Sequence, residues 1–229
     1  YHKRKGSSTI FPLGIGYLIS SLSIHKIDSK ILDFTEKMDD IEEEITELSI
    51  DRAVKKFAAA SRNSEFPLFW GIGPVTTASA VFLEWIVSAI RKYSDKPIIC
   101  GGPLPSISGQ RWLFFDYLKV DAIIMGDGEN AIVEAARYLL DGRLLSECPY
   151  IVTIGRPDYY NLLSDINEAP FPYRIQANAS IRRQIVPAPT ASMITMRGCP
   201  YQCPFCVSGN LRGTGKKKYS KRSIDNIVT

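Results

Sequence analysis

Short apolar segments that end in glycine alternate with helical segments through the middle of this 229-residue chain. The order is apolar 67–73, helical 76–90, apolar 96–100, helical 110–118, apolar 121–125 and helical 130–140. Strands of about five apolar residues separated by helices predict a parallel sheet that is covered on both faces. The sequence therefore predicts an α/β protein with a Rossmann-like parallel sheet and right-handed crossovers between its strands.

Further elements are expected on the N-terminal side of this alternation, from apolar residues at helical or strand spacing. They are a helix at 13–24, a strand at 30–34, an acidic helix that opens at Asp39 and buries Ile41, Ile45 and Leu48, and a second helix at 51–61. The acidic residues of the third element suit the positive end of a helix and otherwise face water.

Three parts follow one another along the chain. Residues 1–141 hold the alternating strands and helices, residues 142–189 are rich in proline, and residues 190–229 begin with a new strand at 192–196. The middle part is too aromatic for a free linker, so we expect an ordered connector. The last part ends on a helix that Ser223 is expected to cap.

The composition excludes several classes of protein. An apolar fraction of 45% excludes global disorder, and five cysteines in a chain of this length do not make a disulfide scaffold. No apolar run reaches the roughly 20 residues that a membrane span needs. Because no secretory signal is recognisable, we expect a cytoplasmic protein. The basic stretch 212–222 is more typical of a solvated loop than of a nucleic-acid site.

Glycines follow each of the three apolar strands, and we expect them to meet at one edge of the sheet. Open α/β sheets bind ligands at the carboxyl ends of their strands. Glycine lets the backbone approach a bulky ligand, and threonine can cap the next helix. The candidate residues are Gly73, Thr76, Thr77, Gly101, Gly102, Gly126, Gly128 and Glu129. The alternative is that each glycine merely ends a strand.

A second motif consists of Cys199, Cys203 and Cys206, in the spacing C-x3-C-x2-C. Thiolates are soft ligands that select zinc, copper(I) or iron–sulfur clusters. A structural zinc ion needs four protein ligands, whereas three thiolates with an open position favour a [4Fe–4S] cluster that uses one iron for chemistry. The alternatives are a structural zinc knuckle in a non-enzymatic α/β binding module, or buried reduced thiols.

Residues 197–206 read Arg-Gly-Cys-Pro-Tyr-Gln-Cys-Pro-Phe-Cys and follow a predicted strand directly. This loop resembles the cluster loop of the radical S-adenosylmethionine (SAM) enzymes. The resemblance implies that the three cysteines ligate a [4Fe–4S] cluster, that its open iron chelates SAM, and that Phe205 lies against the adenine. It also implies cleavage of SAM to a 5′-deoxyadenosyl radical. An electron donor such as flavodoxin or ferredoxin and a small-molecule or peptide substrate are then the expected partners.

Upstream, the turns at 71–77, 101–103 and 126–129 and the proline pair at 170–172 follow one another in a recognisable order. They resemble the N-terminal cobalamin-binding domain of some radical SAM enzymes, among them cobalamin-dependent methylases and anaerobic magnesium-protoporphyrin ester cyclases. The resemblance implies that the candidate residues of the glycine loops contact cobalamin, and that the reaction is methyl transfer or cyclisation. The Asp-x-His-x-x-Gly signature for a histidine ligand is absent, so cobalamin would bind without one.

Two further expectations concern the remaining cysteines and the extent of the domains. The remaining cysteines, Cys100 and Cys148, are expected to be packing residues. They are too few for the second cluster that methylthiotransferases carry. The first strand of the cobalamin-type sheet and most of the barrel are expected outside residues 1–229, so the chain alone is expected not to turn over SAM.

Overall fold

The structure is a computed structural model that describes residues 13–32, 45–60, 67–73, 75–76, 79–174, 192–201, 203, 206 and 219–228. Its helices are α1 (Leu13–Ile24), α2 (Glu47–Ala60), α3 (Ala80–Tyr93), α4 (Glu129–Leu140) and α6 (Ile224–Val228). Its strands are β1 (Trp70–Ile72), β2 (Ile98–Gly101), β3 (Ala122–Gly126), β4 (Tyr160–Asn161), β5 (Met196–Gly198) and β6 (Tyr219–Lys221). Shorter helical turns are η1 (Ser108–Gln110), η2 (Leu113–Tyr117), η3 (Leu145–Glu147) and η4 (Ile166–Glu168).

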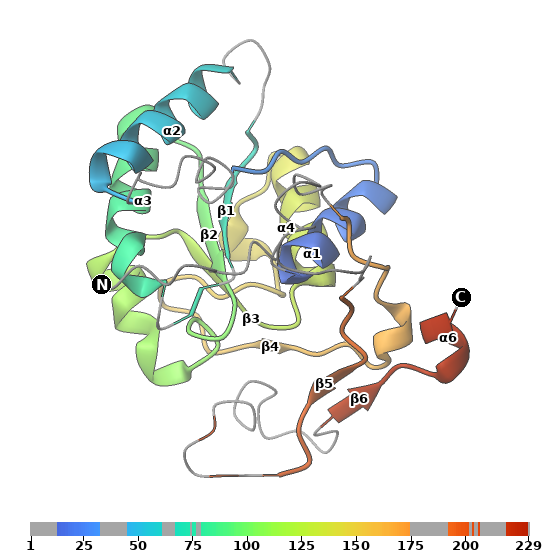
Figure 1. The fold of residues 1–229 in the computed structure, drawn as a ribbon. Coiled ribbons are helices and arrows are strands. Elements are labelled where there is room, and N and C mark those ends of the chain that lie inside the picture. Colours follow the sequence, from blue (N-terminus) through green and yellow to red (C-terminus); the bar gives the residue numbers. More distant parts are fainter. Residues whose placement is uncertain are drawn as a thin grey trace.

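The described strands β1 to β4 form one parallel sheet in the order β1-β2-β3-β4. Figure 1 shows α2 and α3 on one side of this sheet and α1 and α4 on the other. Alternate residues of a strand point to opposite faces, so Ile123 and Met125 of β3 join the core under α2 and α3. Ala122 and Ile124 join the core under α1 and α4. The predicted α/β fold with a covered parallel sheet is confirmed.

The start of α2 corrects one part of the predicted helical pattern. The segment 33–44, which includes Asp39 and Ile41, lies outside the described residues, and Leu48 is 58% exposed rather than buried. Thr46 and Ser49 exchange backbone-to-hydroxyl hydrogen bonds of 3.0 and 3.1 Å that fix the first turn. From that start the buried face is set by Ile50 and Val54, so Leu48 points away from the core.

Two other predicted elements have a different form in the structure. The described part of the expected strand at 30–34, residues 30–32, forms no strand and pairs with none of the described strands. The expected helix at 110–118 is the π-helical turn η2, closed by a 2.9 Å bond from Leu118 N–H to the Leu113 carbonyl. No described helix is long and apolar enough to span a membrane.

The described part of the connector contributes to the sheet. Its residues Tyr160 and Asn161 form β4, which pairs in parallel with Met125 and Gly126 at the end of β3. The Asn161 side-chain amide donates to the carbonyl oxygens of Met125 (3.2 Å) and Tyr150 (2.7 Å). Residues 160–161 of the connector therefore lie against the end of β3, where the last glycine loop begins.

Beyond the connector, β5 and β6 form an antiparallel pair. The predicted strand at 192–196 is displaced, since β5 spans Met196–Gly198 and ends directly before Cys199. The predicted cap of the last helix is confirmed, because the Asn226 N–H donates to the Ser223 hydroxyl at 3.2 Å. Figure 1 shows the pair below and beside the sheet, on the side of β4 and α1.

Candidate functional site

The loops after β1, β2 and β3 are tied to one another at a single edge of the sheet. Val75 N–H donates to the Gly101 carbonyl at 2.8 Å and joins the first loop to the second. The Ser106 hydroxyl accepts from Gly126 N–H and donates to the Gly102 carbonyl, both at 2.9 Å, and joins the second loop to the third. The prediction that these three loops meet is confirmed.

Close packing within the protein also explains why several positions of these loops are glycine. Gly126 has φ +83°, and a Cβ there would collide with the Asn161 backbone of β4. A Cβ on Gly128 would lie 2.9 Å from Leu18 of α1, and one on Gly73 would lie 3.2 Å from the Gly101 carbonyl oxygen. Gly101 is the open position, because an added Cβ would meet nothing closer than the Ile124 carbonyl oxygen at 4.0 Å.

Thr76 of the first loop lies just before the start of α3. Thr76 and Ser79 cap each other: Ser79 N–H donates to the Thr76 hydroxyl at 3.3 Å, and Thr76 N–H donates to the Ser79 hydroxyl at 2.8 Å. This geometry supports the predicted capping role of Thr76. Thr77 lies outside the described residues.

Glu129, predicted as a ligand contact, forms a buried ion pair with Arg197. Both guanidinium Nη atoms of Arg197 donate to the Glu129 carboxylate, one of them over 2.9 Å. Nη1 also donates to Asp127 at 3.1 Å. The side chains of Arg197 and Glu129 are only 14% and 4% exposed. The loop after β3 is therefore joined to β5, two residues before Cys199.

This arrangement stabilises the protonated, positively charged form of Arg197. Burial, the largest single influence, lowers the pKa of its guanidinium, but the hydrogen bonds and charges of Glu129 and Asp127 outweigh it. The net effect raises the pKa of Arg197 above its ordinary value. The Leu163 N–H adds a 2.9 Å bond to the second carboxylate oxygen of Asp127. The largely buried positive charge is thus matched by two carboxylates, and that of Asp127 accepts a further hydrogen bond.

A second arginine and a tyrosine complete the junction. Tyr17 of α1 is fully buried, and the guanidinium carbons of Arg197 and Arg222 lie 5.2 and 5.7 Å from its ring centre. Its hydroxyl accepts from Ile194 N–H at 3.2 Å. Arg222 donates to the carbonyls of Ile194 and Ala169 at 3.1 Å each. We call Tyr17, Asp127, Glu129, Arg197 and Arg222 the arginine joint.

Sequence reasoning placed Asp127, Glu129 and Arg197 inside motifs but did not pair them, and it assigned no role to Tyr17. It expected Arg222 in a solvated basic loop, which is wrong for this residue, because Arg222 is only 5% exposed. Arg197 and Glu129 are 68 positions apart in the chain, and no periodicity links positions so distant. The sequence feature that could have predicted this ion pair was the chemistry of its residues. An arginine at the end of an apolar strand needs an acidic partner if it is buried, and the turn at 126–129 offers two carboxylates.

The cysteine loop begins where β5 ends. Cys199 and Cys206 are half-buried and Cys203 is exposed, and Cys206 N–H donates to the Cys203 carbonyl at 3.0 Å. No three metal-ligating side chains converge on one point within the described ranges, so the structure brings these cysteines onto one loop but not into a coordination shell. Phe205 lies outside the described residues.

The two other cysteines lie in the two cores of the sheet. Both Cys100 and Cys148 are fully buried. Burial raises the pKa of the Cys100 thiol to about 12, and burial likewise raises that of Cys148. Both are therefore protonated packing residues, as predicted.

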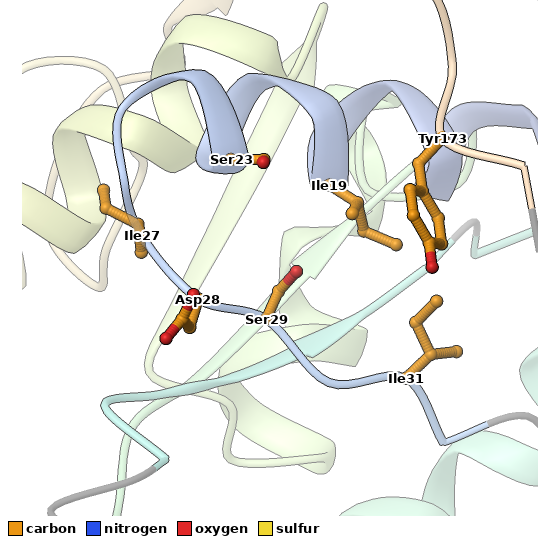
Figure 2. Close-up of a pocket in the computed structure, with 7 residues that line it drawn as sticks. All are labelled: Ile19, Ser23, Ile27, Asp28, Ser29, Ile31 and Tyr173. Carbon is orange, nitrogen blue, oxygen red and sulfur yellow. The ribbon is translucent and has the colours of Figure 1, made fainter.

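A pocket of about 410 Å³ lies between α1 and residues 27–31. Figure 2 shows Ile19 and Ser23 of α1 on one side, Ile31 on the other, and Tyr173 at one end. None of the predicted ligand-contacting residues lines this pocket.

The fold and the tied glycine loops define an α/β ligand-binding domain, and the comparison with protein families specifies its kind. The B12 binding domain matches residues 4–136. The chain therefore belongs to the B12-binding domain family, as its glycine loops indicated.

Two individual proteins resemble the chain over different shares of its length. An uncharacterized methyltransferase of Pyrococcus horikoshii is 25% identical over 99% of the chain and 46% of its own length. The ribosomal protein uS12 methylthiotransferase RimO of Thermosynechococcus vestitus is 30% identical over 38% of the chain and 21% of its own length.

Among solved structures, the radical S-adenosylmethionine methyltransferase TsrM from Kitasatospora setae has a similar fold. Its complex with tryptophan and a SAM analog gives a TM-score of 0.66 at 20% identity, over 98% of the chain and 43% of TsrM. Its complex with cobalamin and a [4Fe–4S] cluster gives a TM-score of 0.67 at 19% identity. The chain spans less than half the length of each of these relatives.

Proposed function

We propose that this chain forms the cobalamin-binding and cluster-binding parts of a radical SAM methyltransferase. One observation carries the proposal: a B12-binding domain and a C-x3-C-x2-C loop lie in one chain, and Arg197 joins the last glycine loop of the first to the strand that leads into the second. The relatives with methyltransferase names support methyl transfer. The proposed parts are residues 1–141, the connector 142–189 and the cluster-bearing part 190–229.

The cysteine loop fits an iron–sulfur cluster by the chemistry of its donors. Cys199, Cys203 and Cys206 would supply three thiolates. The hydrogen bond from Cys206 N–H to the Cys203 carbonyl keeps the last two cysteines on one short segment. Phe205 would contact the adenine of SAM. When bound, the cluster supplies the electron that cleaves SAM reductively, with flavodoxin or ferredoxin as the class of donor.

The glycine loops fit a large ligand by their shared edge and by the open backbone at Gly101. Gly73, Gly101 and Gly102 would let the ligand approach the main chain. Thr76 and Thr77 would border it, and the turn that holds Gly126, Gly128 and Glu129 would support it from the side of Arg197. When bound, cobalamin supplies a carrier for the methyl group. The chain offers no Asp-x-His-x-x-Gly signature, so the proposed binding uses no histidine ligand.

Anaerobic reconstitution of the full-length protein tests the cluster. We expect about four irons and four sulfides per protein, the [4Fe–4S] stoichiometry, and their loss in Cys203→Ala. Cys148→Ala, which removes a thiol outside the motif, should keep the iron. Stoichiometric zinc, or unchanged iron in Cys203→Ala, would contradict the proposal and favour a zinc knuckle.

Cobalamin and product analysis test the reaction class. The reconstituted protein should bind cobalamin, followed by its visible absorbance. With SAM and a strong reductant it should form S-adenosylhomocysteine, the product that SAM leaves after giving up a methyl group. Formation of 5′-deoxyadenosine with no S-adenosylhomocysteine would contradict methyl transfer and point to cyclisation.

A further inference from the structure

The buried ion pair between Arg197 and Glu129 differs in kind from the surface ion pairs of the protein. Arg197, Glu129 and Asp127 have side chains that are 14%, 4% and 12% exposed. By contrast, Arg143 and Glu147 on the surface are each 47% exposed. A buried pair contributes little net stability when compared with apolar packing, but it penalises strongly any arrangement in which one partner is moved away.

The geometry of the pair fixes orientation as well as distance. The two Nη atoms of Arg197 engage both oxygens of Glu129, and Nη1 is shared with Asp127. A planar guanidinium that is held in this way tolerates little rotation, and lysine cannot reproduce it. The ring of Tyr17 lies beside the same guanidinium.

The two partners stand next to the two proposed cofactor sites. Glu129 is the first residue of α4 and lies three positions after Gly126, the end of β3. Arg197 is the central residue of β5, and Cys199 follows two positions later. A displacement of either loop is therefore transmitted to the other loop through the ion pairs that Arg197 forms with Glu129 and Asp127.

We infer that Arg197 is a positioning residue that couples cobalamin binding at the glycine loops to cluster binding at the cysteine loop. The inference rests on the proposed function, because it needs both cofactors to bind this chain. A cluster that draws the three thiols together fixes the cysteine loop, and β5 with it. Arg197 then holds the turn at 126–129 in one position, so that cobalamin meets an ordered loop. Linkage requires the converse as well: bound cobalamin stabilises the cluster by the same factor.

The test is the dissociation constant of cobalamin, measured by absorbance in full-length protein with and without the reconstituted cluster. In the wild type we expect tighter binding with the cluster by at least about fivefold, the lower end of usual coupling. Glu129→Gln keeps the shape of the side chain but removes its charge, and Arg197→Lys keeps the charge but removes the planar fork. In each variant the ratio of the two dissociation constants should fall to about one. The double variant should behave like either single variant, because both remove one interaction.

Glu147→Gln is the matched control, since it removes the 3.0 Å surface pair with Arg143. It should keep the wild-type ratio. A circular-dichroism spectrum like that of the wild type establishes that each variant is folded. If Arg197→Lys does not fold, Glu129→Gln alone provides the test. A ratio of one in the wild type, or a wild-type ratio in Glu129→Gln, overturns the coupling while the proposed function stands. Failure of the wild type to bind either cofactor overturns the proposed function and the coupling with it.

Discussion

Replacement of Gly126 by alanine should destabilise the protein strongly, for two reasons that can be separated. Gly126 has φ +83°, a conformation that costs an L-residue about 1–2 kcal/mol. The new Cβ would also collide with the Asn161 backbone, and forcing an extra methyl group into a packed site typically costs about 1–3 kcal/mol. The free energy of unfolding should therefore fall by about 2–5 kcal/mol in total.

Gly155 provides the matched control, because its φ of +80° is nearly the same and an added Cβ there meets nothing within 4 Å. Gly155→Ala should carry only the conformational cost of about 1–2 kcal/mol. Urea unfolding with linear extrapolation measures both variants. Equal losses for the two variants would refute the argument that β4 packs tightly against Gly126.

Three further predictions concern other parts of the protein. Arg197→Ala should lower the free energy of unfolding by about 3–5 kcal/mol, since it leaves the buried Glu129 carboxylate without its partner; thermal unfolding checks this. The raised pKa of Cys100 means that the folded state holds this proton longer than the unfolded chain does. Its contribution to stability is complete below the ordinary thiol pKa of 9.0 and is lost as the pH rises toward 12. Cys100→Ala should reduce the loss of stability between about pH 8 and pH 10, measured by urea unfolding. Thr76→Ala should cost about 1 kcal/mol through loss of the α3 cap, and a change below the error of urea unfolding would contradict the capping role.

The sequence predicted the sheet well because the pattern that identifies each strand lies within a few neighbouring residues. Each strand of the series β1, β2 and β3 is a short apolar run that ends near glycine, and each lies within or beside its predicted range. The two-residue strand β4 was missed, because it is a strand only through its pairing with Met125 and Gly126. The exposure of Leu48 was missed for a related reason: the buried face of α2 consists of Ile50, Val54 and Ala58, and Leu48, two positions before Ile50, lies on the other side of the helix.

Some features of the candidate site could likewise be predicted from the sequence, and others could not. The meeting of the glycine loops at one edge followed from strand direction alone, and the structure has that edge. The role of Glu129 did not follow, since its partner comes 68 positions later in the chain. Its motif identified the residue as important, whereas only the fold reveals that the carboxylate faces Arg197. The ligand roles of the cysteines and of Phe205 stay predictions.

The arginine joint also bears on the order in which the molecule is assembled. Tyr17 lies in the first described helix, but the groups that surround it, Ile194, Arg197 and Arg222, come from near the other end of the chain; Ile194 is 177 positions away. During synthesis α1 is complete long before these residues leave the ribosome. Until then α1 can dock on α4 through apolar contacts such as those of Leu22. Closure of the joint thus depends on long-range contacts, and the residues that close it are synthesised after those of the parallel sheet.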